Sequence, residues 1–535
     1  MKGQRILVLG LVGVVSFVSG GWLLQRGTTQ AGNVYQQARL FDDVLGYVAD
    51  FYVDSVSEAE LYDMAIDGLL DKLDDPYARF LRAEDIRELT ESTTGNYGGL
   101  GIRIDVRDGW ITIIAPMAES PAEAAGLETG DRIVEVDGES TYGWKSDRAV
   151  SVLRGEPGSK VTISVVRAGF PEPFEVTVER AEIHIRAIQA ATILGSDVGY
   201  VSLVNSSVSE TLTDELADAV TDLRARGARS LLLDLRYNPG GLLDQGVEVA
   251  DLFLDPGQDV VTTRGRGRGA NESYSARRDQ QWPDMPIVVL VNGGTASAAE
   301  IIAGALQDHD RAVVLGEATF GKGVVQTVFR LGRTQALRLT TARWFTPSGR
   351  TIQRPHGGGD VLLMAAAADS ARAVPDSGEE FRTEAGRVVR GGGGIQPDLV
   401  VFPDTLTEPE QAFARSLGAR LPAYRDVLTS YAIDLKGANT ITDSAFVVSS
   451  AMRRELERRL SERAIDVPAV AWDLVNQQFI YEVQRYVFGR RSENARRLSD
   501  DRQVQQALEL LRGSRTVDEL FAAVQRISGE GRGIE

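Results

Sequence analysis

One continuous stretch, residues 286–326, constrains the fold of this 535-residue chain more than any other. It opens with the apolar run IVVLV at 287–291, whose length and β-branched residues predict a buried strand. A Gly-rich turn follows, and Ser297 stands where that turn enters a helix predicted by the spacing of Ala299, Ile302 and Leu306. A serine at such a turn projects its hydroxyl above the sheet, where the helix N-terminus favours developing negative charge.

Further along the same stretch, Lys322 lies between two glycines in TFGKG at 319–323. A serine hydroxyl attacks only when a base removes its proton, and a lysine amine can act as that base when burial lowers its pKa. Ser297 and Lys322 are therefore a candidate nucleophile and base. The alternative is that Ser297 is only a helix N-cap and Lys322 a solvated loop charge. Gln326 follows in the strand-like run 324–330.

Several motifs occur together and in order: DLRYNPGG at 234–241, NGGTASAAE at 292–300, TFGKG at 319–323, FTPSGR at 345–350 and GGGGIQPD at 391–398. This set resembles the signature of the C-terminal processing (tail-specific) serine peptidases, and the likeness extends over roughly residues 35–400. The resemblance implies a catalytic dyad of Ser297 and Lys322 with Gln326 assisting, in a crotonase-like layered α/β peptidase domain. Gln326 would then hold the lysine amine by a side-chain hydrogen bond.

The turn after the strand-like run 231–235 is a candidate oxyanion hole. Its glycine pair can expose backbone amides, so we expect an N–H of Gly240 or Gly241 to act with that of Ala298. A structural turn would also explain the two glycines, and the resemblance favours the catalytic role. A carboxylate beside Lys322 would raise the pKa of the amine, so we expect neither Glu300 nor Glu317 to contact it.

Residues 95–180 resemble a PDZ domain. The segment GLGI stands where that family binds a C-terminal carboxylate, and the amides of a Gly-rich turn suit this role. A substrate tail would add as a strand against residues 102–106, beside a helix predicted at 146–154. The expected peptide contacts are Gly99, Leu100, Gly101, Ile102, Ala149, Val150 and Leu153. Alternatively, these glycines only form a tight turn in a structural β-domain.

Composition excludes several functions. The net charge of −18 gives no support for nucleic-acid binding. The chain has no cysteine, which excludes disulfides and thiolate metal sites, and its three histidines leave little for a metal cluster. We therefore expect neither a metal nor a cofactor.

The N-terminal segment predicts a membrane anchor. Lys2 and Arg5 precede an uncharged apolar run from Ile6 to Leu24, which nearly spans a hydrocarbon core of about 30 Å. The positive flank places the N-terminus in the cytoplasm. This favours an uncleaved single-pass anchor in the cell inner (cytoplasmic) membrane with a periplasmic body, the alternative being a cleaved signal peptide.

The predicted fold class is α/β multidomain, with a crotonase-like layered α/β peptidase domain, an inserted PDZ β-domain and helical regions at both ends. The predicted boundaries are 1–33 for the anchor, 34–94 for an N-terminal helical region, 95–180 for the PDZ-like domain, 181–405 for the peptidase and 406–535 for a helical C-terminal extension. The extension could serve homo-oligomerisation, adaptor docking or as a lid, and the sequence does not choose among them.

The predicted function is a serine endopeptidase that cleaves protein substrates near a free C-terminus, with the PDZ domain reading the tail. Two rival functions are a PDZ scaffold with an inactive peptidase domain and a crotonase-like acyl-CoA enzyme. Residues 316–322 spell G-x-x-x-x-G-K, but Gly323 replaces the Ser or Thr of a phosphate-binding loop. His309 could suggest a Ser-His-Asp triad, although its polar turn favours a surface histidine.

Overall fold

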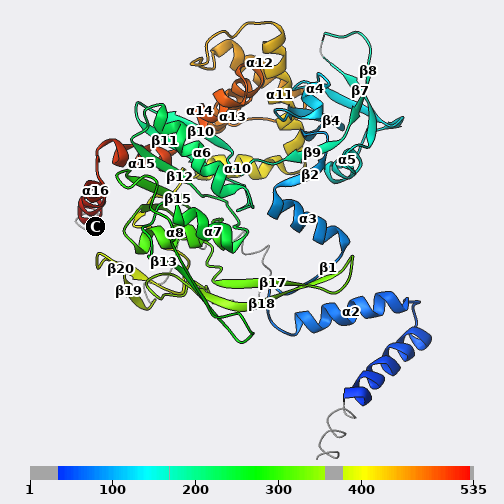
Figure 1. Ribbon diagram of the computed structural model, residues 1–535. Coiled ribbons are helices and arrows are strands. Elements are labelled where there is room, and N and C mark those ends of the chain that lie inside the picture. Colours follow the sequence, from blue (N-terminus) through cyan, green and yellow to red (C-terminus); the bar gives the residue numbers. More distant parts are fainter. Residues whose placement is uncertain (1–33, 168, 356–377, 531–535) are drawn as a thin grey trace, which may run out of the picture. The chain divides into compact units, whose positions relative to one another are not determined.

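The computed structural model describes residues 34–167, 169–355 and 378–530 (Figure 1). The chain forms two compact units, residues 1–83 with 326–340 and residues 84–325 with 341–535. The boundaries fall inside strands β17 (Val324–Arg330) and β18 (Ala336–Phe345), which therefore contribute to both units.

In the first unit, a helix at 34–51 is followed by α2 (Glu58–Asp71) and the short strand β1 (Arg79–Leu81). The sequence S-x-x-E at 57–60 predicts a capping box at the start of α2, and the structure confirms it: the Glu60 amide donates to Ser57 Oγ at 3.3 Å, and the Ser57 amide donates to Glu60 Oε2 at 2.9 Å. Strand β1 pairs antiparallel with residues 336–338 of β18.

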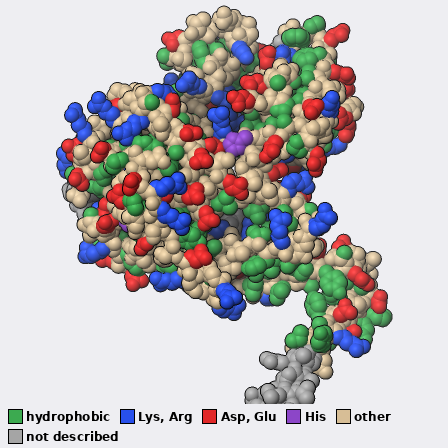
Figure 2. All heavy atoms as spheres, in the orientation of Figure 1, with side chains coloured by type: hydrophobic (Ala, Val, Ile, Leu, Met, Phe, Trp, Pro, Cys, Tyr) green, Lys and Arg blue, Asp and Glu red, His purple; other side chains and the backbone are tan. Residues whose placement is uncertain are grey.

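The helix at 34–51 carries many exposed hydrophobic side chains, which gather on the N-terminal helices in Figure 2. They are Val34, Tyr35, Leu40, Phe41, Val44, Tyr47 and Phe51. Helix α2 buries only Leu61 and Leu70. The helical character predicted for this N-terminal region is thus confirmed, while most of its apolar residues lie outside a packed core.

A six-stranded sheet in the order β10-β11-β12-β15-β16-β21 forms the centre of the second unit. Its first strand, β10, pairs antiparallel with β11, and the remaining neighbours are parallel. The bounds are Ala190–Leu194, Val198–Ser202, Ser230–Asp234, Ile287–Val291, Val313–Gly316 and Leu399–Val400. Parallel strands joined by helices give the layered α/β domain that the sequence predicts.

Both faces of this sheet are covered, which explains why its strands are apolar at successive positions. On one face, Leu233 and Val289 pack with residues of α6 (Leu212–Ala225), α7 (Leu243–Asp251) and α8 (Ala298–Asp308). On the other face, the apolar side chains of the same strands pack against α15 (Arg502–Arg512) and α16 (Val517–Glu530). The end of the C-terminal extension is therefore part of the core of the sheet.

A second group of strands flanks this layer. Strand β13 (Asp259–Gly265) pairs with β14 (Glu272–Ser275) and with residues 342–345 of β18. Residues 356–394 show little periodicity of either kind, which predicts an irregular segment. Part of this segment, 356–377, lies outside the described residues, and the remainder contains a hairpin of β19 (Glu380–Arg382) and β20 (Val388–Arg390), so the expectation was wrong there.

The PDZ-like region is a separate β-structure with its own core. The sheet order is β3-β4-β5-β7-β8, with β6 beside β5. Its strands are Ile102–Arg107, Trp110–Pro116, Arg132–Val136, Glu139–Ser140, Lys160–Val166 and Phe174–Glu179, and its helices α4 and α5 are Pro121–Ala124 and Ser146–Leu153. Helix α3 (Ala83–Thr94) precedes it, and β2 (Asn96–Gly99) pairs with β9 (Ala181–His184) where the chain enters and leaves.

The helical extension begins with a small bundle that has its own apolar core. Its helices are α10 (Glu408–Leu417), α11 (Leu421–Gly437), α12 (Ser450–Glu462), α13 (Trp472–Val483) and α14 (Arg490–Asp500), with short helical turns at Gly418–Arg420, Ala469–Ala471 and Gln484–Phe488. The mainly helical pattern predicted for the extension is confirmed. The domain boundaries drawn from the sequence stay predictions.

The predicted localisation needs correction. Within the part of the chain that the structure describes, no helix combines the length and apolar character needed to cross a membrane. The run from Ile6 to Leu24, on which the anchor was based, lies outside the described residues. The single-pass anchor and the periplasmic location are therefore not retained.

Candidate active site

Ser297 occupies a strained position between β15 and α8. Its backbone has φ +56° and ψ −120°, a conformation that residues other than glycine rarely adopt. The residue is half-buried, and α8 begins directly after it at Ala298. Strain of this kind persists only when the surrounding contacts fix the backbone, and it is concentrated at functional sites.

Hydrogen bonds from a neighbouring turn fix the backbone before Ser297. Asn292 Oδ1 accepts from the amides of Gly294 at 3.1 Å and of Tyr237 at 2.9 Å. Thr295 Oγ1 donates to the carbonyl of Leu235 at 2.8 Å, and the Ala296 amide donates to the carbonyl of Asn238 at 2.9 Å. The predicted nucleophile turn and the DLRYNPGG turn are thus braced against each other.

Gly240 lies directly against Ser297. A Cβ added at Gly240 would lie 2.8 Å from Ser297 Cβ and 2.7 Å from the amide nitrogen of Ala298. Gly240 also has φ +84°, so both its backbone and its surroundings require glycine. The structure therefore brings Gly240, Ser297 and Ala298 together. The Gly240 amide itself donates to Asn238 Oδ1 at 2.9 Å.

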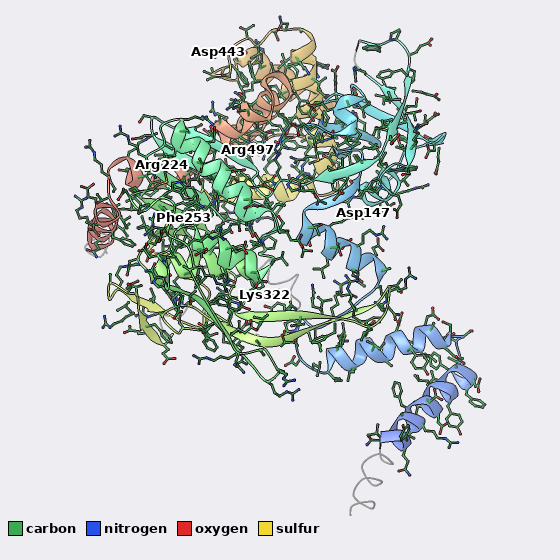
Figure 3. All side chains as sticks on the ribbon, viewed as in Figure 1. Asp147, Arg224, Phe253, Lys322, Asp443 and Arg497 are labelled. Atoms are coloured by element: carbon green, nitrogen blue, oxygen red, sulfur yellow. The ribbon has the colours of Figure 1, made fainter. Side chains whose placement is uncertain are left out.

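Lys322 stands on the loop between β16 and β17 and is labelled in Figure 3. Its carbonyl accepts from the indole Nε1 of Trp344 at 3.0 Å. The Phe320 amide donates to the carbonyl of Thr295 at 3.0 Å, which fixes the loop to the turn before Ser297. The lysine is half-buried.

The buried carboxylate of Glu300 joins the two candidate catalytic residues, a role that the sequence did not predict. Its Oε2 accepts from the backbone amides of Ser297 at 2.8 Å and Lys322 at 2.9 Å. Its Oε1 accepts from the Gly321 amide at 2.7 Å and from Thr319 Oγ1 at 2.5 Å. The expectation that Glu300 does not contact the lysine amine stays a prediction, since these bonds involve the lysine backbone.

Burial raises the pKa of Glu300, and the hydrogen bonds from Thr319 and the three amides partly oppose this increase. The spacing of Ser297 and Glu300 is that of a capping box, S-x-x-E, and this signal could have identified the carboxylate from sequence. The same bonds argue against the phosphate-binding loop that the sequence G-x-x-x-x-G-K at 316–322 suggests. The amides of Gly321 and Lys322, which a phosphate-binding loop would direct at its ligand, are directed at Glu300.

Gln326 lies in the other unit of the chain, on β17, where its Nε2 donates to the carbonyl of Tyr77 at 2.8 Å. Its assistance to Lys322 stays a prediction. His309 was expected at the surface, but its side chain is only 10% exposed and contacts Glu384 Oε2 at 2.8 Å and the Asp259 carbonyl at 2.7 Å. Among the described residues, no group of three or more His, Asp or Glu side chains could hold a metal ion.

In the PDZ-like region, the residues predicted to contact a peptide differ in how far they are buried. Leu100, Ala149 and Leu153 lie in the apolar core of the region, whereas Ile102 and Val150 are only partly buried. Gly101 has φ +72°, and a Cβ there would lie 2.3 Å from that of Ser120, so glycine is required. The peptide contacts stay predictions.

Three family models match this chain in sequence order. Residues 24–85 match the activating protease CtpB N-terminal domain, residues 112–167 match the PDZ domain, and residues 197–360 match peptidase family S41. The last match includes Gly240, Ser297 and Lys322.

The chain is also similar to several proteases described as carboxy-terminal processing. It is 38% identical over 330 residues to a carboxy-terminal-processing protease of Bartonella bacilliformis, covering 61% of this chain and 75% of that protein. It is 40% identical to a carboxyl-terminal-processing protease of Synechocystis, with 54% of this chain and 68% of that protein covered. It is 35% identical to carboxy-terminal processing protease CtpA of Bacillus subtilis, with 57% of this chain and 64% of that protein covered.

Among solved structures, the chain is similar to a photosystem II D1 C-terminal processing protease. The two are 33% identical, with 58% of this chain and 89% of that chain covered and a TM-score of 0.33. The family matches and the identity to curated relatives lead to one conclusion: the chain belongs to peptidase family S41, and it is a serine-type, carboxy-terminal processing peptidase with a PDZ domain.

Proposed function

We propose that this peptidase cleaves protein substrates near a free C-terminus with a Ser297–Lys322 dyad, and that its PDZ domain binds the substrate tail. The observation that carries the dyad is the Glu300 carboxylate, because one of its oxygens accepts from the backbone amides of both residues. A carboxylate oxygen can hold two donors only if they are close neighbours. The two backbones are therefore held within the same small region.

In this mechanism neutral Lys322 takes the proton of Ser297 as the hydroxyl attacks the peptide carbonyl. The protonated amine then donates to the leaving nitrogen, and an acyl-enzyme remains on Ser297. Water attacks the acyl group while neutral Lys322 removes a proton from it, and the protonated lysine then returns that proton to Ser297 Oγ as the acyl–oxygen bond breaks and the new C-terminus is released. Gln326 would orient the lysine amine.

The oxyanion of the tetrahedral intermediate would bind backbone amides at the start of α8. Ala298 lies at the N-terminus of that helix, where the helix dipole favours negative charge. The Gly240 amide already donates to Asn238 Oδ1, which favours Gly241 as the second donor.

The PDZ domain supports substrate selection at the tail. Strand β3 begins at Ile102, directly after the Gly-rich segment, and α5 packs beside it. An extended peptide can add to such a strand while its carboxylate binds the amides of the turn. The substrates would then be proteins with an accessible, unstructured C-terminus.

Cleavage of unfolded β-casein by wild type and by Ser297→Ala tests the dyad. Loss of all measurable cleavage in Ser297→Ala, with thermal unfolding unchanged, is the expected result. Ser348→Ala, on the turn after β18, is the matched serine control and is expected to keep most activity. Equal cleavage by wild type and Ser297→Ala would remove the assignment, and no cleavage by wild type would favour the non-cleaving scaffold.

The lysine base predicts a characteristic pH dependence. Only the neutral amine accepts a proton, so kcat/KM rises with pH until Lys322 is fully deprotonated. Lys322→Arg keeps the positive charge at every accessible pH and is expected to abolish activity. A flat profile from acid to alkaline pH would contradict a lysine base.

Tail recognition is tested by one substrate in two forms, with a free and with an amidated C-terminus. The free form is expected to be cleaved with the lower KM, because the amide lacks the carboxylate that the PDZ turn would bind. Equal KM values for the two forms would remove the role of the PDZ domain in reading the tail.

A further inference from the structure

Arg236, in the turn that leads to Gly240, connects the active site to the C-terminal extension. On one side, its Nε donates to Asp234 Oδ1 at 2.9 Å and its Nη2 to Asp234 Oδ2 at 2.6 Å. Asp234 ends strand β12 and is fully buried. This two-pronged contact fixes the plane of the guanidinium group.

On its other side, Arg236 binds the start of α15. Its Nη1 donates to Asp501 Oδ2 and to Gln503 Oε1, both at 2.8 Å. The Gln503 side chain also donates to the carbonyl of Val401, directly after β21, at 2.6 Å. The arginine thus joins the end of a central strand to residues more than 260 positions later in the chain.

Asp501 also has a local role, which has to be separated from its contact with Arg236. Its Oδ1 accepts from the amides of Gln503 at 2.9 Å and Val504 at 3.1 Å, so it is the N-cap of α15. The two oxygens therefore serve different partners. The apolar side of α15 packs on the central sheet, beside β12 and β15 (Figure 1), and holds the cap in place.

The turn that Arg236 anchors is strained. Tyr237, the next residue, has φ +57°, which is unusual for a bulky side chain. From there the chain passes through Asn238 to Gly240, which lies against Ser297 and Ala298. A strained turn keeps its shape only when both ends are held, and Arg236 holds the end nearer to β12.

We propose that Asp501 and Gln503 are positioning residues for catalysis, which act through Arg236 to hold the turn at 236–241 against Ser297. The start of α15 is then a working part of the active site as well as a cover for the sheet. This inference rests on the proposed function of Ser297. Disturbing the contact is expected to lower kcat and leave KM unchanged, because both residues act through Arg236 and the turn.

Asp501→Asn is the sharpest test, because asparagine is as good an N-cap as aspartate but lacks the charge that binds Arg236. Asp500→Asn is the matched control: it removes the same charge one position earlier, where the carboxylate binds Tyr481 and Arg496. With β-casein as substrate, kcat is expected to fall at least about tenfold in Asp501→Asn, with KM within about twofold of wild type. Asp500→Asn is expected to match wild type.

A double-mutant cycle separates positioning from general destabilisation. Arg236→Lys keeps the charge but loses the fork that contacts both partners. If the two residues act as one unit, the double variant Arg236→Lys with Asp501→Asn has the kcat of Arg236→Lys alone. Effects on log kcat that simply add would overturn the inference. So would equal losses of kcat in Asp500→Asn and Asp501→Asn.

Hydrogen exchange gives a readout that does not depend on activity. Amides of the segment 234–242 are expected to exchange faster in Asp501→Asn than in wild type or Asp500→Asn, while those of α8 keep their protection. If wild type and Ser297→Ala cleave equally, the proposed function fails and this measurement still decides whether α15 holds the turn. Wild-type exchange and wild-type kcat in Asp501→Asn would overturn this inference alone.

Discussion

At the scale of single residues, the site depends on one glycine that has no room for a side chain and on one buried carboxylate whose hydrogen bonds hold two turns together. Gly240 fits against Ser297 only because it lacks a Cβ. Glu300, fully buried, accepts hydrogen bonds from three backbone amides and one hydroxyl. Each of these residues holds the site without itself being a candidate nucleophile or base.

Gly240→Ala is expected to lower kcat/KM by about a hundredfold, the scale of a misplacement of about 1 Å at the reacting groups. The new methyl group would meet the Ala296 carbonyl at 2.5 Å and displace the Ser297 turn. Gly257→Ala is the matched control, because Gly257 also has positive φ, +89°, but nothing lies within 4 Å of an added Cβ. Kinetics with β-casein would check both, and equal activities would contradict the close contact.

Glu300→Ala is expected to destabilise the protein by about 3 kcal/mol or more, because it leaves several buried donors without their acceptor. Glu300→Gln keeps the volume but turns an NH2 group towards hydrogen-bond donors. It can no longer hold the backbones of Ser297 and Lys322 together, so this variant is expected to be inactive. Chemical denaturation measures the first effect and substrate cleavage the second. Wild-type stability of Glu300→Ala would show that the carboxylate does not hold the two turns.

At the scale of elements, strand order determines which loops meet. Strands β12, β15 and β16 are adjacent and parallel, so the loops after their carboxyl ends lie at the same edge of the sheet. Those loops carry Gly240, Ser297 and Lys322. In the C-terminal extension, a cluster of ion pairs joins α14 to the helical turn before it, because Glu493 on α14 binds both Arg485 and Arg497.

The pKa of Glu493 predicts a pH dependence for the helical bundle. Burial raises this pKa, but the hydrogen bonds and charges of Arg485 and Arg497 lower it by more, so the folded value lies below the ordinary 4.5. A lowered carboxyl pKa stabilises the fold above the unfolded value, and this contribution is lost as the pH falls through the folded value. The free energy of unfolding is therefore expected to decrease from about pH 5 downwards.

Glu493→Gln removes this contribution and is expected to cost about 2 kcal/mol at neutral pH, with a smaller difference from wild type in acid. Glu457→Gln, on the exposed side of α12, is the control and is expected to be neutral. Thermal unfolding followed by circular dichroism at several pH values would measure both. A difference between wild type and Glu493→Gln that does not change with pH would contradict this account.

At the scale of the whole molecule, the C-terminal extension has two parts with different roles. Helices α10 to α13 surround their own core, whereas α15 and α16, together with Leu498 of α14, complete the core of the peptidase sheet. The sequence left open dimerisation, adaptor docking and a lid. Packing on the sheet gives the last two helices a structural role that does not depend on a partner.

A chain that ends at residue 500 is expected to be insoluble or to aggregate, because it exposes the apolar face formed by Tyr200, Leu232, Val288, Leu290 and Leu315. A chain that ends at residue 530 keeps both helices and is the control. Soluble yield and binding of a hydrophobic dye would measure the effect. A soluble, active chain ending at residue 500 would show that the sheet needs no cover from α15.

The sequence by itself determined the buried strand at 287–291, the helix after it and the segments that carry the candidate nucleophile and base, because periodicity, caps and motifs are local patterns; it missed the short hairpin of β19 and β20. It also determined that both faces of the central strands are apolar. Only the tertiary structure decided which segment covers the second face, and that Glu300 binds the backbones of Ser297 and Lys322. The physical reason is that a buried group takes its partners from whatever the topology brings near, and local sequence does not encode that proximity.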